Sequence, residues 1–424
     1  MSSSVGPRTS PVTPSNRTRT ARPTRTRWRR WVAVLLLSLL TLALAAVLAI
    51  GWYFSGQALT VTTAGQSTVT VEADGPDRVW LEREGYAAYV GEHGLRSAEA
   101  DAWLLAGGTL GAEDAPVVGI VGEILDDSGE RVLRSYESIS GQLPEGPVEM
   151  VMAQDVYWPD PSALDLPFEE VELTGELGPL PSWVVPATGD SVDGAAGGSE
   201  DTWAIFVHGR GGSREEALRY LPTLRDAGLT TLAISYRNDP EAPPDPNGRY
   251  GLGETEWRDV ESALTYAREQ GADQVLLLGW SMGAAISLQT LDRSPEAELV
   301  TGLWLDAPVI DWRDTFYAQG ELNGLPRPLT WVAQQLIQAR GDLRLADFDW
   351  VARADELPGL PIHIEHSDGD TFVPNGPSKA LAEKRPDIVT LNTDSGAEHT
   401  RTWNADPEGY DARLAEWLTE RASG

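Results

Sequence analysis

Short apolar runs that alternate with amphipathic stretches dominate the chain from Trp203 onward. Strands of about four to eight residues separated by longer helices are typical of βαβ units, whose parallel strands are buried on both faces. Two further runs upstream, Val171 with Leu173 and Trp183 to Val185, are predicted as antiparallel opening strands. The parallel strands are expected at AIFV, LTTLAIS, QVLLLG, TGLWLD, PIHIE and IVTL. We therefore predict an α/β fold with a mostly parallel, doubly wound sheet.

A G-x-S-x-G pattern occurs inside this region, in the sequence LLLGWSMGAA. Gly279, Ser281 and Gly283 follow a strand-like run and precede a helix-like run, which is the context of a nucleophile elbow. A serine on such a sharp turn projects outward, and the residues two positions away must be small so that strand and helix can approach each other. Ser281 is therefore the candidate nucleophile.

A serine hydroxyl becomes an effective nucleophile only when a base takes its proton. Among five histidines, His399 lies just after the last predicted strand, and the chain order serine, acid, histidine selects it. His93 lies far upstream and is expected at the surface or in a turn. The acid is expected in EHSDGDTFVP, after the preceding strand. Asp370 begins the D-x-x-V-P run and is preferred, with Asp368 as the alternative.

The negative charge that develops on a tetrahedral acyl intermediate requires hydrogen-bond donors. The sequence VHGRGG supplies a glycine-rich turn after the first parallel strand, where such donors belong in this architecture. We expect the backbone amides of Arg210 and Met282 to form the oxyanion hole, with Gly209 in the turn. This chemistry needs no metal and no organic cofactor, and the cysteine-free sequence excludes a thiol nucleophile and zinc-thiolate sites.

These motifs resemble those of the α/β-hydrolase superfamily over about residues 150 to 424. The matching positions are His208-Gly209 after the third strand, GWSMG at the elbow, D-x-x-V-P after the seventh strand and His399 after the eighth. HGRGGSREE, SYRND and EWRDVESAL look like segments of membrane-anchored bacterial hydrolases grouped with serine aminopeptidase and prolyl-oligopeptidase-like enzymes. The resemblance implies the fold and a Ser-His-Asp triad and leaves the substrate open. Glu398 departs from the commoner glycine before the histidine.

A run of 24 uncharged residues extends from Trp31 to Phe54. As a helix it exceeds the hydrocarbon thickness of a bilayer, about 30 Å. Residues 1–30 carry eight arginines and no acid, while Trp52, Tyr53 and Phe54 lie at the other end, where an aromatic belt belongs. We predict an uncleaved single-pass anchor in the cell membrane, with a cytoplasmic N-terminus and an extracytoplasmic catalytic domain. The alternative is a cleaved signal peptide, whose apolar core is usually only about 7 to 15 residues long.

The predicted organisation has four parts. Residues 1–30 form a disordered basic tail, 31–54 the transmembrane helix, 55–148 a small β-rich accessory region and 149–424 the catalytic domain. Within the catalytic domain, 311–357 is a candidate lid, because a long segment with helical stretches separates two consecutive strands there.

The body of the chain is strongly acidic, since all 64 Asp and Glu lie beyond residue 71 and the net charge is −31. Such a surface repels phosphate backbones, so nucleic acid is not an expected partner. The predicted function is hydrolysis of a carboxylic ester or related acyl compound, small or lipid-like, through an acyl-enzyme. The alternatives are a peptidase or acyltransferase on the same triad, and a non-catalytic scaffold of the cell envelope.

Overall fold

The computed structural model describes residues 25–62, 66–105, 110–112, 114–153, 158–188, 202–393 and 396–422. By its internal contacts the chain divides into two units, Met1–Ala49 and Ile50–Gly424. Most of the predicted basic tail, residues 1–24, lies outside the described residues.

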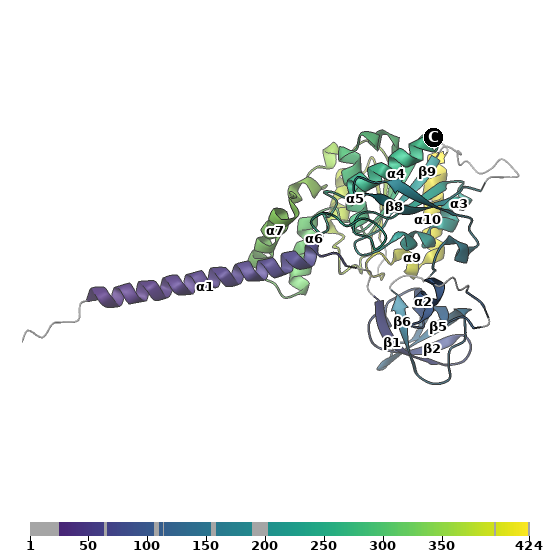
Figure 1. Ribbon diagram of the computed structural model, residues 1–424, viewed down its shortest axis with the longest axis horizontal. Helices are drawn as coiled ribbons and strands as arrows, with labels where there is room; N and C mark the ends of the chain where they lie inside the picture. Colours follow the sequence, from purple (N-terminus) through teal and green to yellow (C-terminus); the bar gives the residue numbers. More distant parts are fainter. Residues whose placement is uncertain are drawn as a thin grey trace, which may run out of the picture. The chain divides into compact units, whose positions relative to one another are not determined.

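A long helix, α1 (Arg25–Leu59), contains the uncharged run (Figure 1). Its segment Trp28–Leu59 is sufficient in length and apolar composition to cross a membrane. The helix continues past Phe54, the predicted end of the span, so its last turns belong to the second unit.

The second unit contains an eight-stranded mixed sheet in the order β14-β13-β12-β11-β9-β10-β8-β7. Strands β9 to β14 run parallel to one another, whereas β8, next to the edge strand β7, is antiparallel to both of its neighbours, β10 and β7. All eight strands lie where the sequence predicted them, and the predicted α/β fold is confirmed. Their bounds are β7 (Glu169–Thr174), β8 (Pro179–Val185), β9 (Thr202–Val207), β10 (Thr230–Ile234), β11 (Gln274–Trp280), β12 (Val300–Asp306), β13 (Ile362–Glu365) and β14 (Val389–Asn392).

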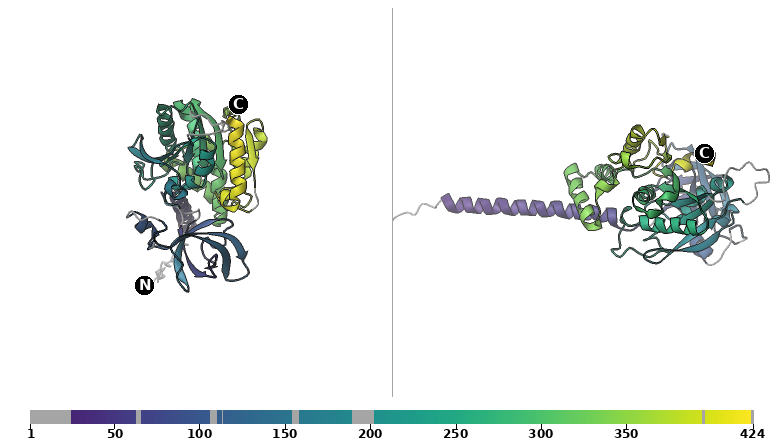
Figure 2. Two further views of the ribbon diagram at one scale, coloured as in Figure 1. Left: turned by 90° about the vertical axis from the view of Figure 1, so that its right-hand side faces the viewer. Right: turned by 90° about the horizontal axis from the view of Figure 1, so that it is seen from above.

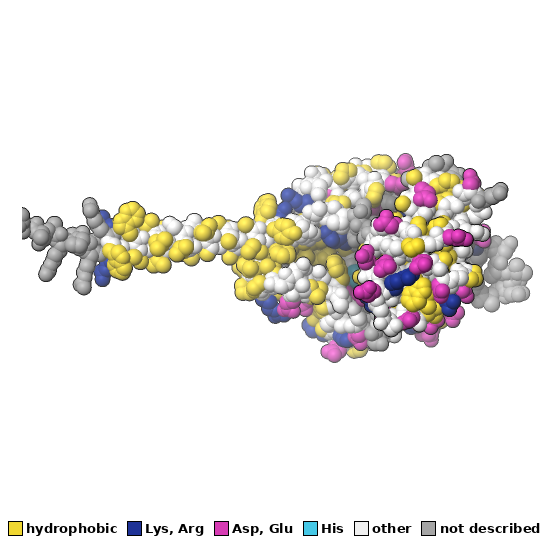
Figure 3. All heavy atoms as spheres, turned by 90° about the horizontal axis from the view of Figure 1, so that it is seen from below, with side chains coloured by type: hydrophobic (Ala, Val, Ile, Leu, Met, Phe, Trp, Pro, Cys, Tyr) yellow, Lys and Arg dark blue, Asp and Glu magenta, His cyan; other side chains and the backbone are white. Residues whose placement is uncertain are grey.

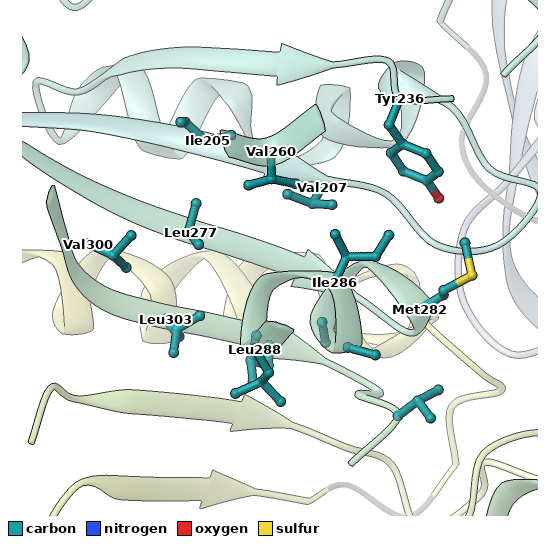
Figure 4. Close-up of a cluster of buried hydrophobic side chains, with 14 of the residues drawn as sticks. Ile205, Val207, Tyr236, Val260, Leu277, Met282, Ile286, Leu288, Val300 and Leu303 are labelled. Carbon is teal, nitrogen blue, oxygen red and sulfur yellow. The ribbon is translucent and has the colours of Figure 1, made fainter. Parts of the chain in front are cut away.

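Helices cover both faces of this sheet (Figures 1 and 2). On one face, α4 (Trp257–Glu269) buries Val260 and Leu264, which lie one helical turn apart, against apolar side chains of β9 and β11. Figure 4 shows Val260 beside Val207 of β9 and facing Ile286 of α5 (Met282–Arg293). On the other face, α3 (Leu221–Asp226) and α10 (Pro407–Ala422) pack over a second apolar cluster. The sheet is thus buried on both sides, and the edge where its parallel strands end is left for a site.

The predicted lid region forms two helices and two short 3₁₀ turns, α6 (Trp312–Leu322), α7 (Arg327–Gly341), η4 (Leu345–Phe348) and η5 (Ala354–Glu356). The Asp311 side chain accepts a hydrogen bond from the Arg313 amide and so caps α6. The remaining elements of the catalytic domain are η1 (Pro161–Leu164), η2 (Arg214–Arg219), η3 (Pro295–Leu299), α8 (Gly376–Lys384) and α9 (Thr402–Ala405).

The predicted β-rich region is a closed six-stranded antiparallel barrel in the order β1-β2-β5-β4-β3-β6. The strands are β1 (Gln66–Ala73), β2 (Arg78–Glu82), β3 (His93–Arg96), β4 (Val118–Asp126), β5 (Arg131–Ser140) and β6 (Val148–Ala153), and the short helix α2 (Ala100–Leu105) follows β3. Because β6 begins at Val148, the barrel continues beyond the boundary expected there. The surface position expected for His93 is wrong, since its side chain is fully buried with Nε2 3.1 Å from the Val90 carbonyl oxygen.

Candidate active site

Ser281 lies at a sharp turn between strand β11 and helix α5. Its backbone angles, φ 52° and ψ −111°, are strained for a residue with a side chain. The Ser281 amide donates a 2.9 Å hydrogen bond to the Asp306 carbonyl oxygen, which ties the turn to the end of β12. This is the strand-to-helix elbow that the sequence predicted.

The glycines around the elbow allow three backbones to approach closely. A Cβ atom at Gly283 would lie 2.1 Å from the carbonyl oxygen of Val207, and one at Gly279 would lie 2.8 Å from the first turn of α5. At Gly209, in the turn after β9, an added Cβ would lie 3.3 Å from Cβ of Ser281. Larger residues at these positions would force β9, β11 and α5 apart.

The three side chains singled out by chain order lie in one line of hydrogen bonds. His399 Nε2 is 2.8 Å from Ser281 Oγ, and His399 Nδ1 is 2.7 Å from Asp370 Oδ2. Asp370 follows β13 and His399 follows β14, so the ends of neighbouring parallel strands bring together residues that are far apart in the chain. A base oriented by a carboxylate and in contact with a serine hydroxyl is the arrangement that nucleophilic catalysis requires.

Asp370 is held as a buried carboxylate. Its Oδ1 accepts hydrogen bonds from the amides of Phe372 and Val373, both at 2.8 Å, and His366 Nε2 lies 3.4 Å from its Oδ2. Burial alone would raise the pKa of Asp370, but the charge of His399 and the hydrogen bonds from His366 and His399 outweigh it and lower the pKa well below its usual range. The group is therefore ionised at neutral pH and able to orient an imidazole.

Asp368, the alternative acid, makes contacts at the surface. Its Oδ1 accepts hydrogen bonds from Lys379 Nζ at 2.7 Å and from Asn375 Nδ2 at 2.6 Å, and these bonds lower its pKa. Its side chain is about half exposed. The structure thus brings Asp370 rather than Asp368 to His399.

Two other histidines of the catalytic domain have partners away from Ser281. His208 is fully buried, stacks on Tyr236 and lies 2.8 Å from Asp239 Oδ2. Burial by itself would lower the pKa of His208, but the Asp239 carboxylate raises it. His363 Nε2 lies 2.8 Å from Glu365 Oε1. These contacts are those of satisfied structural histidines.

The two residues expected to supply oxyanion donors border the elbow. Met282 is the first residue of α5, where amides lack intrahelical partners. Arg210 lies in the loop after β9 and, like Ser281, lines two cavities at this edge of the sheet. The Arg210 guanidinium donates 2.9 Å hydrogen bonds to the carbonyl oxygens of Gln57 and Thr60, so the last turn of α1 fastens this loop.

One cavity, of about 440 Å³, is mainly apolar and extends from Ser281 between the end of α1 and the helices α6 and α7. Small-molecule sites typically measure about 300–1,000 Å³. We call it the apolar cavity. Its described lining residues are Tyr53, Phe54, Gln57, Ala58, Arg210, Ser281, Val309, Trp312, Thr315, Phe316, Gln319, Gly320, Asn323, Leu325, Thr330, Ala333, Gln334, Ile337 and Phe372.

A second cavity, of about 230 Å³, lies on the His399 side of Ser281 and is lined largely by polar groups. We call it the polar cavity. Burial and the charge of Asp370 raise the pKa of Glu398, one of its walls. Its described lining residues are Tyr89, Gly209, Arg210, Glu216, Ser281, Thr371, Phe372, Glu398, His399, Thr400 and Arg401.

Several lining residues were missed by the sequence analysis. Tyr89 belongs to the barrel, and no motif links it to the elbow. Phe372 lies two positions after Asp370, so its place in the D-x-x-V-P run was a signal that could have identified it. Tyr53 and Phe54 were assigned only to a membrane interface, although they also line the apolar cavity. Among the described residues, no group of three or more His, Asp or Glu has the geometry to hold a metal ion.

The chain is similar to known proteins at two levels, a protein family and individual solved structures. A model of the Alpha/beta hydrolase family matches residues 204–423, about half of the chain. Similar solved structures include an esterase from Pyrococcus furiosus (20% identity, 62% of this chain and 94% of that chain, TM-score 0.47). They also include a lidless α/β serine hydrolase from Xanthomonas campestris (18%, 60% and 92%, TM-score 0.40) and a thermophilic esterase from Thermogutta terrifontis (16%, 59% and 98%, TM-score 0.42). No curated protein matches the chain.

Proposed function

Since this chain belongs to the alpha/beta hydrolase family, we propose that it is a membrane-anchored serine hydrolase that cleaves a carboxylic ester or a related acyl compound. The observation that carries the proposal is the line of hydrogen bonds from Ser281 Oγ through His399 to the buried carboxylate of Asp370. No metal and no organic cofactor takes part in the proposed reaction.

In the proposed mechanism, His399 takes the proton of Ser281 Oγ while the oxygen attacks the acyl carbon. Asp370 fixes the imidazole orientation and stabilises the imidazolium that forms. The tetrahedral oxyanion is held by the amides of Arg210 and Met282. The carbon–oxygen bond to the alcohol then breaks, and His399 gives its proton to the departing alcohol. A water molecule, activated by His399 in the same way, then attacks the acyl carbon of the acyl-enzyme. This step releases the acid and restores Ser281.

In this proposal, each of the two cavities binds a different part of the substrate. The apolar cavity holds the acyl part, and the polar cavity, with Glu398 and Tyr89 in its walls, receives the leaving alcohol and later the water. A polar cavity of about 230 Å³ is also large enough to favour a second candidate function, transfer of the acyl group to an acceptor hydroxyl. The same triad serves both reactions.

The proposed organisation follows the sequence prediction. In this proposal, residues 1–30 form a cytoplasmic tail and 31–54 cross the membrane. The barrel and the catalytic domain that follows it are extracytoplasmic, with 311–357 as the lid. The length and composition of α1 support the span. The barrel, expected at 55–148, continues through β6 to Ala153 and supplies Tyr89 to the site.

The test is labelling of the detergent-solubilised full chain with a fluorophosphonate, read by intact mass. We expect one adduct on the wild type, none on Ser281→Ala, and a turnover of 4-nitrophenyl butanoate that falls by several orders of magnitude in that variant. Ser262→Ala, on α4, is the matched control and should retain both. A folded wild type without adduct or turnover would contradict the proposal and favour the scaffold alternative.

A further inference from the structure

The lining of the apolar cavity differs in charge from the rest of the molecule. The chain carries 64 acidic residues, yet of the described residues that line this cavity Arg210 alone is charged. The walls formed by α6 and α7 combine apolar side chains, among them Trp312, Phe316 and Ile337, with uncharged polar ones such as Thr315 and Gln334. A surface of this kind favours an uncharged apolar ligand, because burying a charge there without a partner is costly.

The last turns of α1 form one wall of the apolar cavity. Tyr53, Phe54, Gln57 and Ala58 all line it, although the first two lie inside the predicted membrane span and the others just beyond it. The segment is continuous with the helix that we propose crosses the bilayer. The cavity that begins at Ser281 therefore has a wall that starts at the membrane surface.

Helix α7 packs closely along this segment and fixes the wall. A Cβ atom at Gly51 would lie 2.9 Å from Cγ1 of Val332, so the glycine lets the two helices approach. Arg340 Nη1 donates a 2.8 Å hydrogen bond to the Trp52 carbonyl oxygen, and its guanidinium lies 4.0 Å from the centre of the Trp52 ring. The lid helix is thus attached to the outer end of the proposed membrane anchor.

Large apolar side chains are exposed on these same elements. Trp52 and Tyr53 on α1 are 57% and 60% exposed, while Leu322 at the end of α6 and Trp331 on α7 are 63% and 54% exposed. Figure 3 shows apolar side chains gathered around a hollow on this face of the molecule. Exposed apolar residues grouped in this way mark a contact surface, and Trp and Tyr are the residues that favour the interface between bilayer and water.

We propose that the substrate is a long-chain acyl ester resident in the bilayer, and that its acyl chain enters the apolar cavity between the end of α1 and the α6–α7 pair. The inference rests on the proposed function, because Ser281 must attack the ester at the inner end of the cavity. An acyl chain that takes this route leaves one apolar environment for another, so little apolar surface meets water on the way. The anchor then serves as part of the substrate site as well as a tether.

The experiment reconstitutes the full chain into phosphatidylcholine vesicles that contain either 4-nitrophenyl butanoate or 4-nitrophenyl palmitate. The wild type should hydrolyse the palmitate with the higher kcat/KM. Ala333→Trp narrows the cavity from α7, and Ala58→Leu narrows it from α1. Each should lower the palmitate-to-butanoate ratio of kcat/KM by at least about tenfold. Ala339→Trp, on the exposed side of α7, is the matched control and should keep the wild-type ratio.

A second arm tests delivery from the bilayer. At a fixed mole fraction of palmitate ester, addition of enzyme-free vesicles of the same composition should leave the rate unchanged, because each enzyme draws on its own membrane. A rate that rises with the added vesicles overturns the inference. A wild type that hydrolyses the butanoate ester but not the palmitate ester also overturns it. If Ala333→Trp fails to fold, Ala58→Leu decides the test, and an unchanged palmitate-to-butanoate ratio of kcat/KM in that variant overturns the inference as well. Absence of both hydrolysis and fluorophosphonate labelling would instead reject the proposed function.

Discussion

At the scale of single residues, Asp306 makes the stability of the catalytic domain depend on pH. Burial, followed by the charge of Glu365, raises the pKa of Asp306 to about 8, against about 3.9 in an unfolded chain. Between about pH 4 and 8 unfolding therefore releases a proton, so stability falls as pH rises, and below about pH 4 both states are protonated. Asp306→Asn should remove this dependence of the free energy of unfolding on pH, which amounts to on the order of a few kcal/mol across the window. Thermal melts of both proteins at pH 5 and pH 8 measure it.

The control for this prediction is Asp368→Asn, an exposed aspartate whose pKa is lowered rather than raised. Asp368 titrates below the pH range in which Asp306 acts. The melting temperature of Asp368→Asn should therefore change with pH between 5 and 8 as that of the wild type does. Parallel melting curves for Asp306→Asn and the wild type would contradict the assignment of this pH dependence to Asp306.

Sequence reasoning located the three reacting side chains because chain order and strand ends constrain them strongly. Ser281, Asp370 and His399 each follow a separate parallel strand, and such strands end at one edge of the sheet. Their catalytic roles remain predictions. The D-x-x-V-P run favoured Asp370 but left Asp368 as an alternative, because the partner that α8 supplies to Asp368, Lys379, has no local signal in the sequence.

At the scale of elements, the barrel contributes a wall to the polar cavity. The loop between β2 and β3 places Tyr89 in that cavity, and Arg134 Nη1 donates hydrogen bonds to the carbonyl oxygens of Ala87 and Tyr89, at 3.1 and 2.7 Å. Burial lowers the pKa of Arg134 to about 10, and such a buried cation fixes the loop that it bonds. The barrel thus lines the cavity that we propose receives the leaving group.

We expect Tyr89→Ala to change leaving-group selectivity. The ratio of kcat/KM for glyceryl monobutanoate to that for 4-nitrophenyl butanoate should fall about three- to tenfold, equivalent to about 0.7–1.4 kcal/mol. Tyr86→Ala is the control. The Tyr86 ring packs on Tyr89 and on the barrel core, but Tyr86 is not among the described residues that line the polar cavity. Equal ratios in the wild type and Tyr89→Ala would show that the barrel does not shape the site.

The elements of the catalytic domain were predictable because buried parallel strands are continuous apolar runs. The barrel was predictable only as a β-rich region, since short alternating strands do not specify which of them pair. Closure joins β1 to β6, which are far apart in the chain. His93 is buried in β3 of the same barrel. Neither the closure nor the contribution of Tyr89 to the site has a local signal in the sequence.

At the scale of the whole molecule, the use of α1 as a cavity wall bears on whether the N-terminal segment is retained. Cleavage as a signal peptide after Phe54 would remove Tyr53 and Phe54 from the wall, and Arg340 would lose its contact with Trp52. An uncleaved anchor keeps these contacts. In the proposed topology, the arginines of residues 1–30 hold the tail in the cytoplasm, and the acidic body lies on the other side.

The cysteine-free chain allows a direct test of this topology. A membrane-impermeant maleimide should label Ser128→Cys, on an exposed barrel turn, in intact spheroplasts, and should label Ser10→Cys only after permeabilisation. The wild type, which has no thiol, sets the background. Labelling of Ser10→Cys from outside would reverse the orientation. A mature chain whose intact mass shows that it begins after Phe54 would establish cleavage, and with it the loss of Tyr53 and Phe54 from the cavity wall.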